Sequence, residues 1–294
     1  MLDLDQHDLT LRCLRSLAAG ASLPDTVVLV ENGQHIPCAS TGTLASSLPI
    51  VVLSAGQNLG CAGGRNLGLN YLARNTTLTT FVVLDNDAVA TPDLIERLLA
   101  APPQPLDVVA PVIFDAVSGC VWSSGGSIDG TGELLQFDND LSDYPDAYRE
   151  VNWAPGACLV MHKDTWLTVG EFDSWMIFLY EDIEWCHRLR AAGGRVLVAR
   201  DLRIDHMANQ SLGGRLSPAR LRLGVRNETV LRISVLGRSG TVRFLGRESL
   251  SALRDLAGRR SRLSGARARG LAEGLAEARR RGSVHQSGRG NVAS

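Results

Sequence analysis

The chain lacks any long apolar stretch. No run in its 294 residues approaches the ~18–20 uninterrupted apolar residues that a helix needs to cross a bilayer. Residues 1–5 are acidic, whereas a secretory signal begins with a basic segment that an apolar segment follows. We therefore expect a cytoplasmic protein. The hydrophobic content of 45% is high enough for a large buried core.

The sequence also lacks a paired cysteine motif. Its six cysteines are scattered and contain no C-x-x-C spacing, so they indicate neither a structural zinc site nor a disulfide framework. Buried thiols are the simpler interpretation. These cysteines are Cys13, Cys38, Cys61, Cys120, Cys158 and Cys186.

Acidic residues are scarce in the last part of the chain. Residues 1–214 hold 12 Lys and Arg against 26 acids, a net charge of −14, whereas residues 215–294 hold 18 Arg against 5 acids, a net charge of +13. This contrast predicts a catalytic domain over 1–214, with its boundary near Gly213 and Gly214, a basic helical extension over 215–280 and a disordered tail over 281–294.

The basic region has few aromatic residues. Its only one is Phe244, and nucleic-acid binding is not expected without stacking residues or a known motif. The amphipathic segment 242–257 interleaves apolar residues with arginines, which predicts peripheral contact with an anionic membrane or packing on the catalytic domain. Neither alternative is excluded by the sequence. The oligomeric state is not indicated.

The acidic region alternates strand and helix patterns. Helical spacing occurs at residues 8–17, 64–73 and 92–99, and buried-strand runs occur at 27–30, 50–54, 81–84 and 108–113. This alternation predicts a mostly parallel α/β sheet covered by helices. Residues 115–149 are rich in Gly, Ser and Asp, which favours loops or irregular hairpins.

Two motifs lie at predicted strand ends. A glycine-dense segment, residues 58–69, allows backbone amides to approach a ligand closely. About twenty residues later, an apolar strand ends in Asp85-Asn86-Asp87, whose i, i+2 carboxylates point to one side and suit a divalent cation. Ligands of such sheets bind outside the carboxyl ends of the strands. A dinucleotide fingerprint is a weaker interpretation, because it leaves the acid pair unexplained.

A third motif follows residue 169. It reads Gly170-x-Phe172-Asp173 and, after a gap, Phe178-x-Tyr180-Glu181-Asp182-x-Glu184. Adjacent buried carboxylates raise the pKa of one of them, which suits a general base. The alternative is an acidic helix start, with Glu184 and Arg188 as an i, i+4 pair. We expect that pair to be structural.

Together these motifs resemble the family 2 glycosyltransferases, particularly the rhamnosyltransferase-like branch. The resemblance extends from about Leu9 to Arg226, with Cys61 in the place of an aromatic residue. It implies a GT-A-like fold and an inverting transfer of a sugar from a UDP- or dTDP-linked donor to an acceptor hydroxyl of a glycan, a lipid-linked acceptor or a natural product. It also implies a full first strand, of which only residues 1–4 are present. Either the natural start lies further upstream, or the protein tolerates a shortened strand, which should weaken the sheet and the base pocket.

The resemblance assigns roles to individual residues. Asp182 takes the place of the general base, and Asp85, Asp87 and His206 take those of the ligands to Mg or Mn. Trp153 and Glu181 are expected at the acceptor, although a core tryptophan is nearly as good an interpretation of Trp153. Donor binding is expected of Glu31, Asn58, Gly60, Gly64, Arg65, Asp85, Asn86, Asp87, Gly156 and Ala157. Two other functions stay open: a catalytically inactive nucleotide-sugar-binding protein and a nucleotidyltransferase.

Overall fold

The computed structural model describes residues 1–33, 47–129, 133–139, 141–142, 144–207, 217–236 and 238–289. The chain divides into two compact units. The first comprises Met1–Ser127, Leu135–Ile177 and Glu181–Ala208, and the second comprises Ile128–Leu134, Phe178–Tyr180 and Asn209–Ser294. The domain boundary predicted from the sequence did not assign Ile128–Leu134 and Phe178–Tyr180 to the second unit. The predicted boundary at Gly213 and Gly214 lies outside the described residues.

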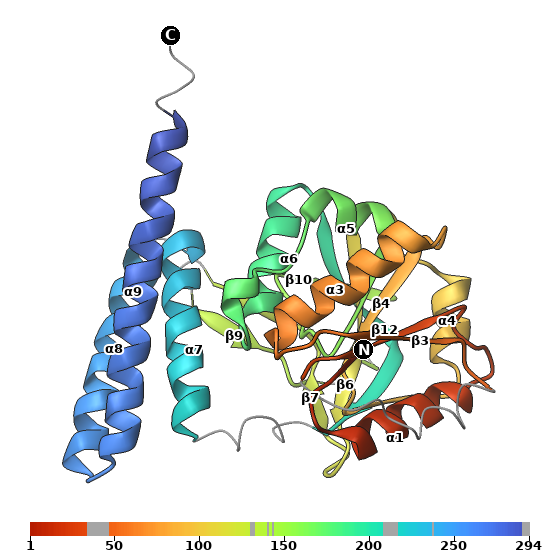
Figure 1. Ribbon diagram of the computed structural model, residues 1–294, viewed down its shortest axis with the longest axis horizontal. Helices are drawn as coiled ribbons and strands as arrows, with labels where there is room; N and C mark the ends of the chain where they lie inside the picture. Colours follow the sequence, from red (N-terminus) through yellow and green to blue (C-terminus); the bar gives the residue numbers. More distant parts are fainter. Residues whose placement is uncertain are drawn as a thin grey trace. The chain divides into compact units, whose positions relative to one another are not determined.

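The first unit alternates strands and helices (Figure 1). Its helices are α1 (His7–Ala18), α3 (Gly60–Asn75), α4 (Leu94–Ala100), α5 (Lys163–Val169) and α6 (Glu181–Ala191). Its longer strands are β2 (Val27–Glu31), β3 (Ile50–Ser54), β4 (Thr80–Leu84), β6 (Asp107–Asp115), β11 (Cys158–His162) and β12 (Arg195–His206). Shorter strands are β1 (Leu2–Asp3), β5 (Ala88–Ala90), β7 (Val121–Ser123), β8 (Gly126–Ile128), β9 (Leu134–Gln136) and β10 (Tyr148–Val151).

The predicted strands and helices form, with ends that differ by a few residues. The prediction of a mostly parallel sheet is wrong in detail. The pairs β1–β2, β2–β3 and β6–β12 are parallel, whereas β11 runs antiparallel to both β4 and β6. The sheet is mixed because β11 and β10 arrive through the irregular middle segment rather than through a helical crossover.

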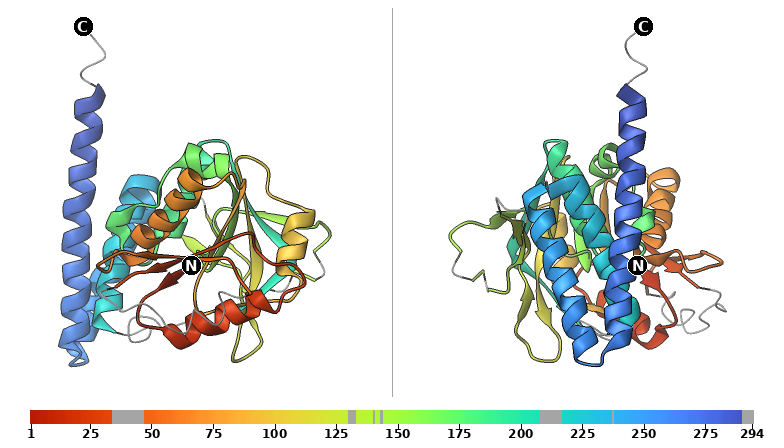
Figure 2. Two further views of the ribbon diagram at one scale, coloured as in Figure 1. Left: turned by 45° about the vertical axis from the view of Figure 1, so that its right-hand side comes forward. Right: turned by 90° about the vertical axis from the view of Figure 1, so that its left-hand side faces the viewer.

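Both faces of the larger sheet are covered. Val109, Val160 and Leu197 point to a core that they share with α1 and α4, and the alternating residues Leu159 and Val198 are also buried. Figures 1 and 2 show α1 on one side of the strands and α3, α5 and α6 on the other. This layering is typical of an α/β domain.

The strands form separate sheets, in the orders β1-β2-β3 and β10-β12-β6-β11-β4. β1 pairs only with β2, at two residues, and no strand in the described part of the chain joins β2 to β4. A largely apolar cavity of about 160 Å³ lies there, lined among others by Val28 and Val30 of β2 and by Thr80 and Val82 of β4. This cavity therefore separates the two sheets where they face each other.

The second unit consists mainly of α7 (Pro218–Leu231), α8 (Arg238–Ala257) and α9 (Ser261–Arg289). Gly270 and Gly274 of α9 let it approach α7 closely, because a Cβ at either position would come within 2.6 Å of an α7 atom. No described helix is long and apolar enough to cross a membrane. α9 is helical as far as Arg289, whereas a disordered tail was expected from residue 281.

Candidate active site

Three side chains with oxygen or nitrogen ligands converge where β4 ends. One potential ligand atom from each of Asp85, Asp87 and His206 lies within 4.8 Å of the others. Strand register brings them together, because β12 pairs with β5 and sets His206 opposite Ala88, the residue after Asp87. His206 Nε2 lies 2.9 Å from Asp87 Oδ1. The structure thus assembles the residues that the sequence proposed for a cation.

The donor set fits a hard divalent cation. Two carboxylates and one imidazole suit Mg or Mn, and Asp87 and His206 are both buried. Burial lowers the pKa of His206, but the hydrogen bond from its ring to Asp87 and the charge of that carboxylate outweigh burial and raise it. The imidazole thus lies beside the Asp87 carboxylate, which a bound cation would also contact. Its ring also contacts Trp122, with centroids 5.1 Å apart.

Arg65, on the first turns of α3, connects this cluster to the Glu181-Asp182 segment. Its guanidinium donates to Glu181 Oε1 at 2.7 Å, to Asp85 Oδ1 at 2.9 Å and to the Gly156 carbonyl at 3.2 Å. Arg65 and Glu181 are both buried. Burial opposes the charge of Arg65, but the two carboxylates raise its pKa well above the usual value. Protein groups therefore already bind the guanidinium that the sequence assigned to donor binding.

Gly156 is required by this arrangement. A Cβ at residue 156 would lie 2.6 Å from Nη1 of Arg65, so any other residue would displace the guanidinium. The neighbouring Ala157 accepts a hydrogen bond through its carbonyl from the Asp85 amide at 2.9 Å. Both predicted donor residues thus lie beside the acidic cluster and help to hold it.

Glu181 and Asp182 begin α6 and have different partners. Asp182 accepts hydrogen bonds from the Gly156 amide and from the Ile183 amide, each at 2.8 Å, and no cationic side chain in the described chain forms an ion pair with it. Desolvation raises the pKa of Asp182, and desolvation together with the charge of Asp182 raises the pKa of Glu181 to about 7. Asp182 is therefore the carboxylate without a bound guanidinium.

The glycine-dense segment is held by two asparagines. Asn58 Oδ1 accepts from the Gly60 amide at 2.8 Å, and Gly60 has a φ of +72°, which favours glycine. Asn32, at the end of β2, donates to the Gly60 carbonyl and accepts from the Leu59 amide, both at 2.9 Å. Sequence reasoning gave Asn32 no role, although a short amide directly after a buried strand was the available signal.

Gly64, the second glycine of this segment that was predicted to bind the donor, packs closely against its neighbours. A Cβ at Gly64 would lie 2.7 Å from the Leu2 side chain and 3.3 Å from that of Asn32. Gly64 therefore allows α3 to approach β1 and the end of β2. Close packing of the helix is a sufficient reason for this glycine, whether or not a donor also contacts it.

Three predicted residues lie elsewhere or have other partners. Trp153 is 6% exposed and packs on Gly126, whereas stacking on a sugar would require an open ring. Asn86 donates to Thr10 Oγ1 of α1 at 3.0 Å. Glu31 is buried as the last residue of β2, between Asp3 and Ser54 in the neighbouring strands.

The expected structural pair of α6 is present. Arg188 donates to both carboxylate oxygens of Glu184, at 2.8 and 3.0 Å, which confirms the i, i+4 pair. The same guanidinium donates to the carbonyls of Val169 and Glu171, both at 2.6 Å. Arg188 thereby ties α6 to the segment after α5.

Comparison with known proteins gives a family match over part of the chain, and a fold. Residues 7–147 match the family model described as Glycosyl transferase family 2. No curated protein is significantly similar in sequence. Among solved structures, the chain is similar to the mannosyltransferase PcManGT from Pyrobaculum calidifontis in complex with GDP-Man and Mn2+, with 12% identity and a TM-score of 0.55 over 93% of this chain and 85% of that one.

Two further structures are similar at comparable levels. GalNAc-T7 with UDP, GalNAc and Mn2+ has 14% identity and a TM-score of 0.53, over 78% of this chain and 48% of that chain, so the protein spans about half of its length. S. aureus TarS 1-349 in complex with UDP has 13% identity and a TM-score of 0.53, over 84% and 70%. Residues 7–147 therefore match the glycosyl transferase family 2 model, and the chain has the GT-A fold of glycosyltransferases.

Proposed function

We propose that the protein is an inverting, cation-dependent glycosyltransferase of the rhamnosyltransferase-like branch, which uses a UDP- or dTDP-linked sugar and an acceptor hydroxyl. The observation that carries the proposal is the position of Arg65, which joins Asp85 of the acidic cluster to Glu181, the neighbour of Asp182. This connection supports a cation site and a general base at the same end of the sheet. The solved structures with UDP, GDP-Man and Mn2+ support a nucleotide-sugar donor.

The cation would be held by Asp85, Asp87 and His206. When bound, Mg or Mn neutralises the diphosphate of the donor and stabilises it as a leaving group. Arg65 fixes the position of Asp85 through its 2.9 Å hydrogen bond, so this carboxylate needs little rearrangement to bind the cation.

Asp182 would act as the general base. Its carboxylate is oriented by the amides of Gly156 and Ile183, and each oxygen keeps a lone pair for a further hydrogen bond. The acceptor hydroxyl gives its proton to Asp182 while its oxygen forms a bond to the anomeric carbon. The bond from that carbon to the diphosphate oxygen breaks on the opposite face, which inverts the configuration.

A melting experiment tests the donor and the cation. UDP, dTDP and GDP are each added with and without Mn, and a ligand that binds the folded protein raises the melting temperature by mass action. We expect stabilisation by UDP or dTDP that requires Mn and that Asp87→Ala abolishes. Stabilisation by GDP alone would overturn the choice of nucleotide, and Mn-independent binding would overturn the cation site.

Turnover of the stabilising donor separates the remaining alternatives. Slow hydrolysis of the nucleotide sugar that stops in EDTA is expected of a glycosyltransferase without its acceptor. Binding without hydrolysis or transfer would favour an inactive nucleotide-sugar-binding protein. Release of pyrophosphate from a nucleoside triphosphate and a sugar phosphate would favour a nucleotidyltransferase.

A further inference from the structure

α8 has one buried face and one exposed apolar face. Phe244 and Glu248 point to the neighbouring helices, with 2% and 7% of their surface exposed. Along the opposite side run Val242, Leu250, Leu253 and Leu256, which are 69%, 48%, 63% and 57% exposed. Helical spacing places these four side chains on one face. Figures 1 and 2 show α8 alongside α9 within this unit.

Positive charge is concentrated next to this face. Residues 249–272 contain six arginines and one acid, Asp255, which pairs with Arg267 at 3.0 Å. The other five arginines are exposed, and none of them has an acidic partner within ion-pair distance in the described part of the chain. These five, which we call the turn arginines, are Arg254, Arg259, Arg260, Arg262 and Arg269.

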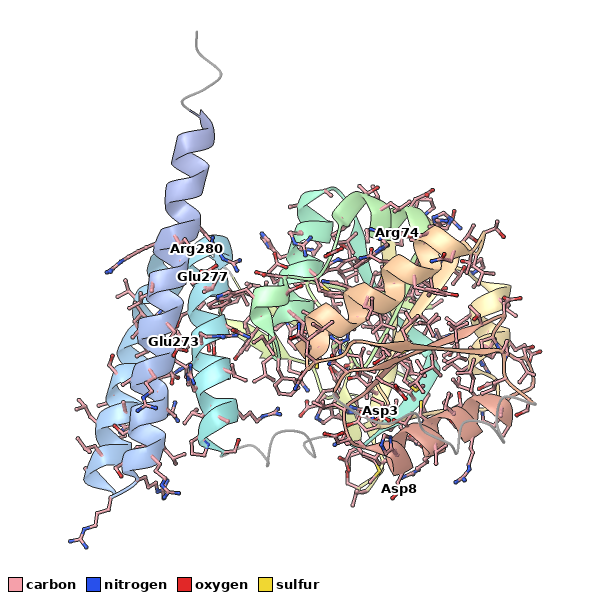
Figure 3. The ribbon with its side chains drawn as sticks, in the orientation of Figure 1. Asp3, Asp8, Arg74, Glu273, Glu277 and Arg280 are labelled. Carbon is pink, nitrogen blue, oxygen red and sulfur yellow. The ribbon has the colours of Figure 1, made fainter. Side chains whose placement is uncertain are left out.

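Other arginines of the same unit are neutralised. Arg232 pairs with Glu228 at 2.8 Å, and Arg247 pairs with Glu133 at 2.9 Å. Towards the end of α9, Arg280 and Glu277, both labelled in Figure 3, pair at 2.6 Å. The uncompensated charge therefore gathers around the turn between α8 and α9, beside the exposed leucines.

We propose that the exposed face of α8 and the turn arginines bind the surface of an anionic lipid bilayer. An interfacial helix needs an apolar side that enters the headgroup region and basic residues at its edge. Leu250, Leu253 and Leu256 supply the apolar side. The guanidinium groups of the turn arginines supply the basic edge and bind lipid phosphates with two hydrogen bonds each. The inference does not depend on the proposed transfer reaction.

The chemistry of this surface favours lipid over other occupants. If two copies of the chain paired through this face across a two-fold axis, the turn arginines of one copy would lie against those of the other. Repulsion between these like charges opposes such a dimer. Single-stranded nucleic acid would need aromatic rings for base stacking, but the exposed large apolar residues of α8 are all aliphatic. An anionic bilayer matches both the aliphatic and the cationic parts.

Vesicle sedimentation of the full chain tests the proposal. We expect binding at low salt to vesicles of phosphatidylcholine mixed with phosphatidylglycerol, little binding to phosphatidylcholine alone, and release at high salt. The pair Arg259→Gln and Arg260→Gln should weaken binding about thirty-fold, because each basic residue at a bilayer contributes about five-fold. The pair Leu253→Ser and Leu256→Ser should weaken binding to anionic vesicles at high and low salt alike.

Matched controls come from the first unit. Leu99→Ser with Leu167→Ser replaces leucines that are 61% and 60% exposed, and Arg74→Gln with Arg190→Gln removes two exposed arginines, of which Figure 3 labels Arg74. Neither control should change vesicle binding. Equal binding to neutral and anionic vesicles, no binding at low salt, or parent-like binding by both α8 variants would overturn the proposal. If the parent chain is a dimer in solution and the leucine variant is a monomer, the membrane proposal would also be overturned, in favour of self-association.

Discussion

At the scale of single residues, the site depends on how Arg65 pairs with two of three neighbouring carboxylates. Arg65 binds Glu181 and Asp85, and it leaves Asp182, the neighbour of Glu181, without a cationic partner. Arg65 opposes the rise in the pKa of Glu181, which desolvation and Asp182 cause, whereas in the described chain Asp182 is held by backbone amides alone. The two adjacent acids of α6 therefore differ in their ion pairing.

Asp182→Asn tests the task of the base. The variant keeps the size and the hydrogen-bonding capacity of the side chain but cannot accept a proton, so transfer should fall by ~10²–10⁴. Donor affinity, measured by calorimetry with Mn, should stay within a few-fold. Glu184→Gln is the control, because that carboxylate pairs with Arg188 alone among the described side chains and its loss should hardly change activity. Normal turnover by Asp182→Asn would rule out the proposed base.

Glu181 should make stability depend on pH. Its pKa is raised to about 7 in the folded protein by desolvation and by Asp182, from 4.5 in an unfolded chain. The folded state then binds more protons between these values, so the contribution of Glu181 to stability falls as pH rises from about 4.5 through 7. The free energy of urea unfolding of the parent, relative to Glu181→Gln, should decrease by about 1–3 kcal/mol between pH 5 and 8. A constant difference would contradict the raised pKa.

Arg65 should be costly to replace. Arg65→Met would leave Asp85 and Glu181 with no cationic partner, and breaking a buried ion pair in this way destabilises by about 3–5 kcal/mol. We expect a lower urea midpoint at pH 8 and a smaller loss at pH 5, where Glu181 is protonated. Arg97→Met serves as the control, because its pair with Asp93 is exposed and solvent screens it, so its loss should hardly change the urea midpoint. Equal losses for the two variants would show that the Arg65 network is no more than a surface pair.

At the scale of elements, the segment before α6 is strained. Leu179 and Tyr180 have φ values of +72° and +70°, a left-handed conformation that costs non-glycine residues about 1–3 kcal/mol each. α7 holds this segment: Asn227 donates to the carbonyls of Phe178 and Leu179 at 2.9 and 2.8 Å, and the Tyr180 hydroxyl donates to Glu228 at 2.7 Å. The helical unit thereby fixes three residues that directly precede Glu181 in the chain.

Asn227→Ala should separate turnover from donor binding. Its side chain is fully buried, so the variant should lose about 1–3 kcal/mol of stability. With the strained segment released, kcat should fall several-fold more than donor affinity, and both can be measured on folded protein at low temperature. Asn70→Ala is the control, since Asn70 makes an exposed bond to Glu171. A variant that loses stability but keeps kcat would leave Asn227 with a structural role alone.

At the scale of the whole domain, packing is incomplete between the two sheets. Between β2 and β4 there is a cavity of about 160 Å³, and its lining side chains lack the contacts that a packed core would give. Val28→Ile adds one methylene to this cavity and should stabilise by about 0.5–1 kcal/mol in urea unfolding. Val160→Ile, in fully packed β11, should instead destabilise by about 1–3 kcal/mol. Equal effects would show that the cavity closes in solution.

Much of the fold could be read from the sequence because its signals are local. The apolar runs that became β2, β3, β4 and β6 alternate with helical spacing, so the α/β class required no long-range information. The direction of β11 was not predictable, since no local pattern distinguishes an antiparallel neighbour from a parallel one. The cytoplasmic location and the roles of the site residues stay predictions.

The sequence by itself determined the acid pair at the end of β4, the glycine-dense start of α3 and the Glu181-Asp182 start of α6, because each depends on neighbouring residues. Only the tertiary structure decided which groups meet. Arg65 and Glu181 are 116 positions apart, and the pairing of β12 with β5 brings His206 to Asp87. The burial of Trp153 and the exposure of Leu253 were likewise set by packing. A side chain's partners depend on how distant segments fold together, and local patterns do not encode that arrangement.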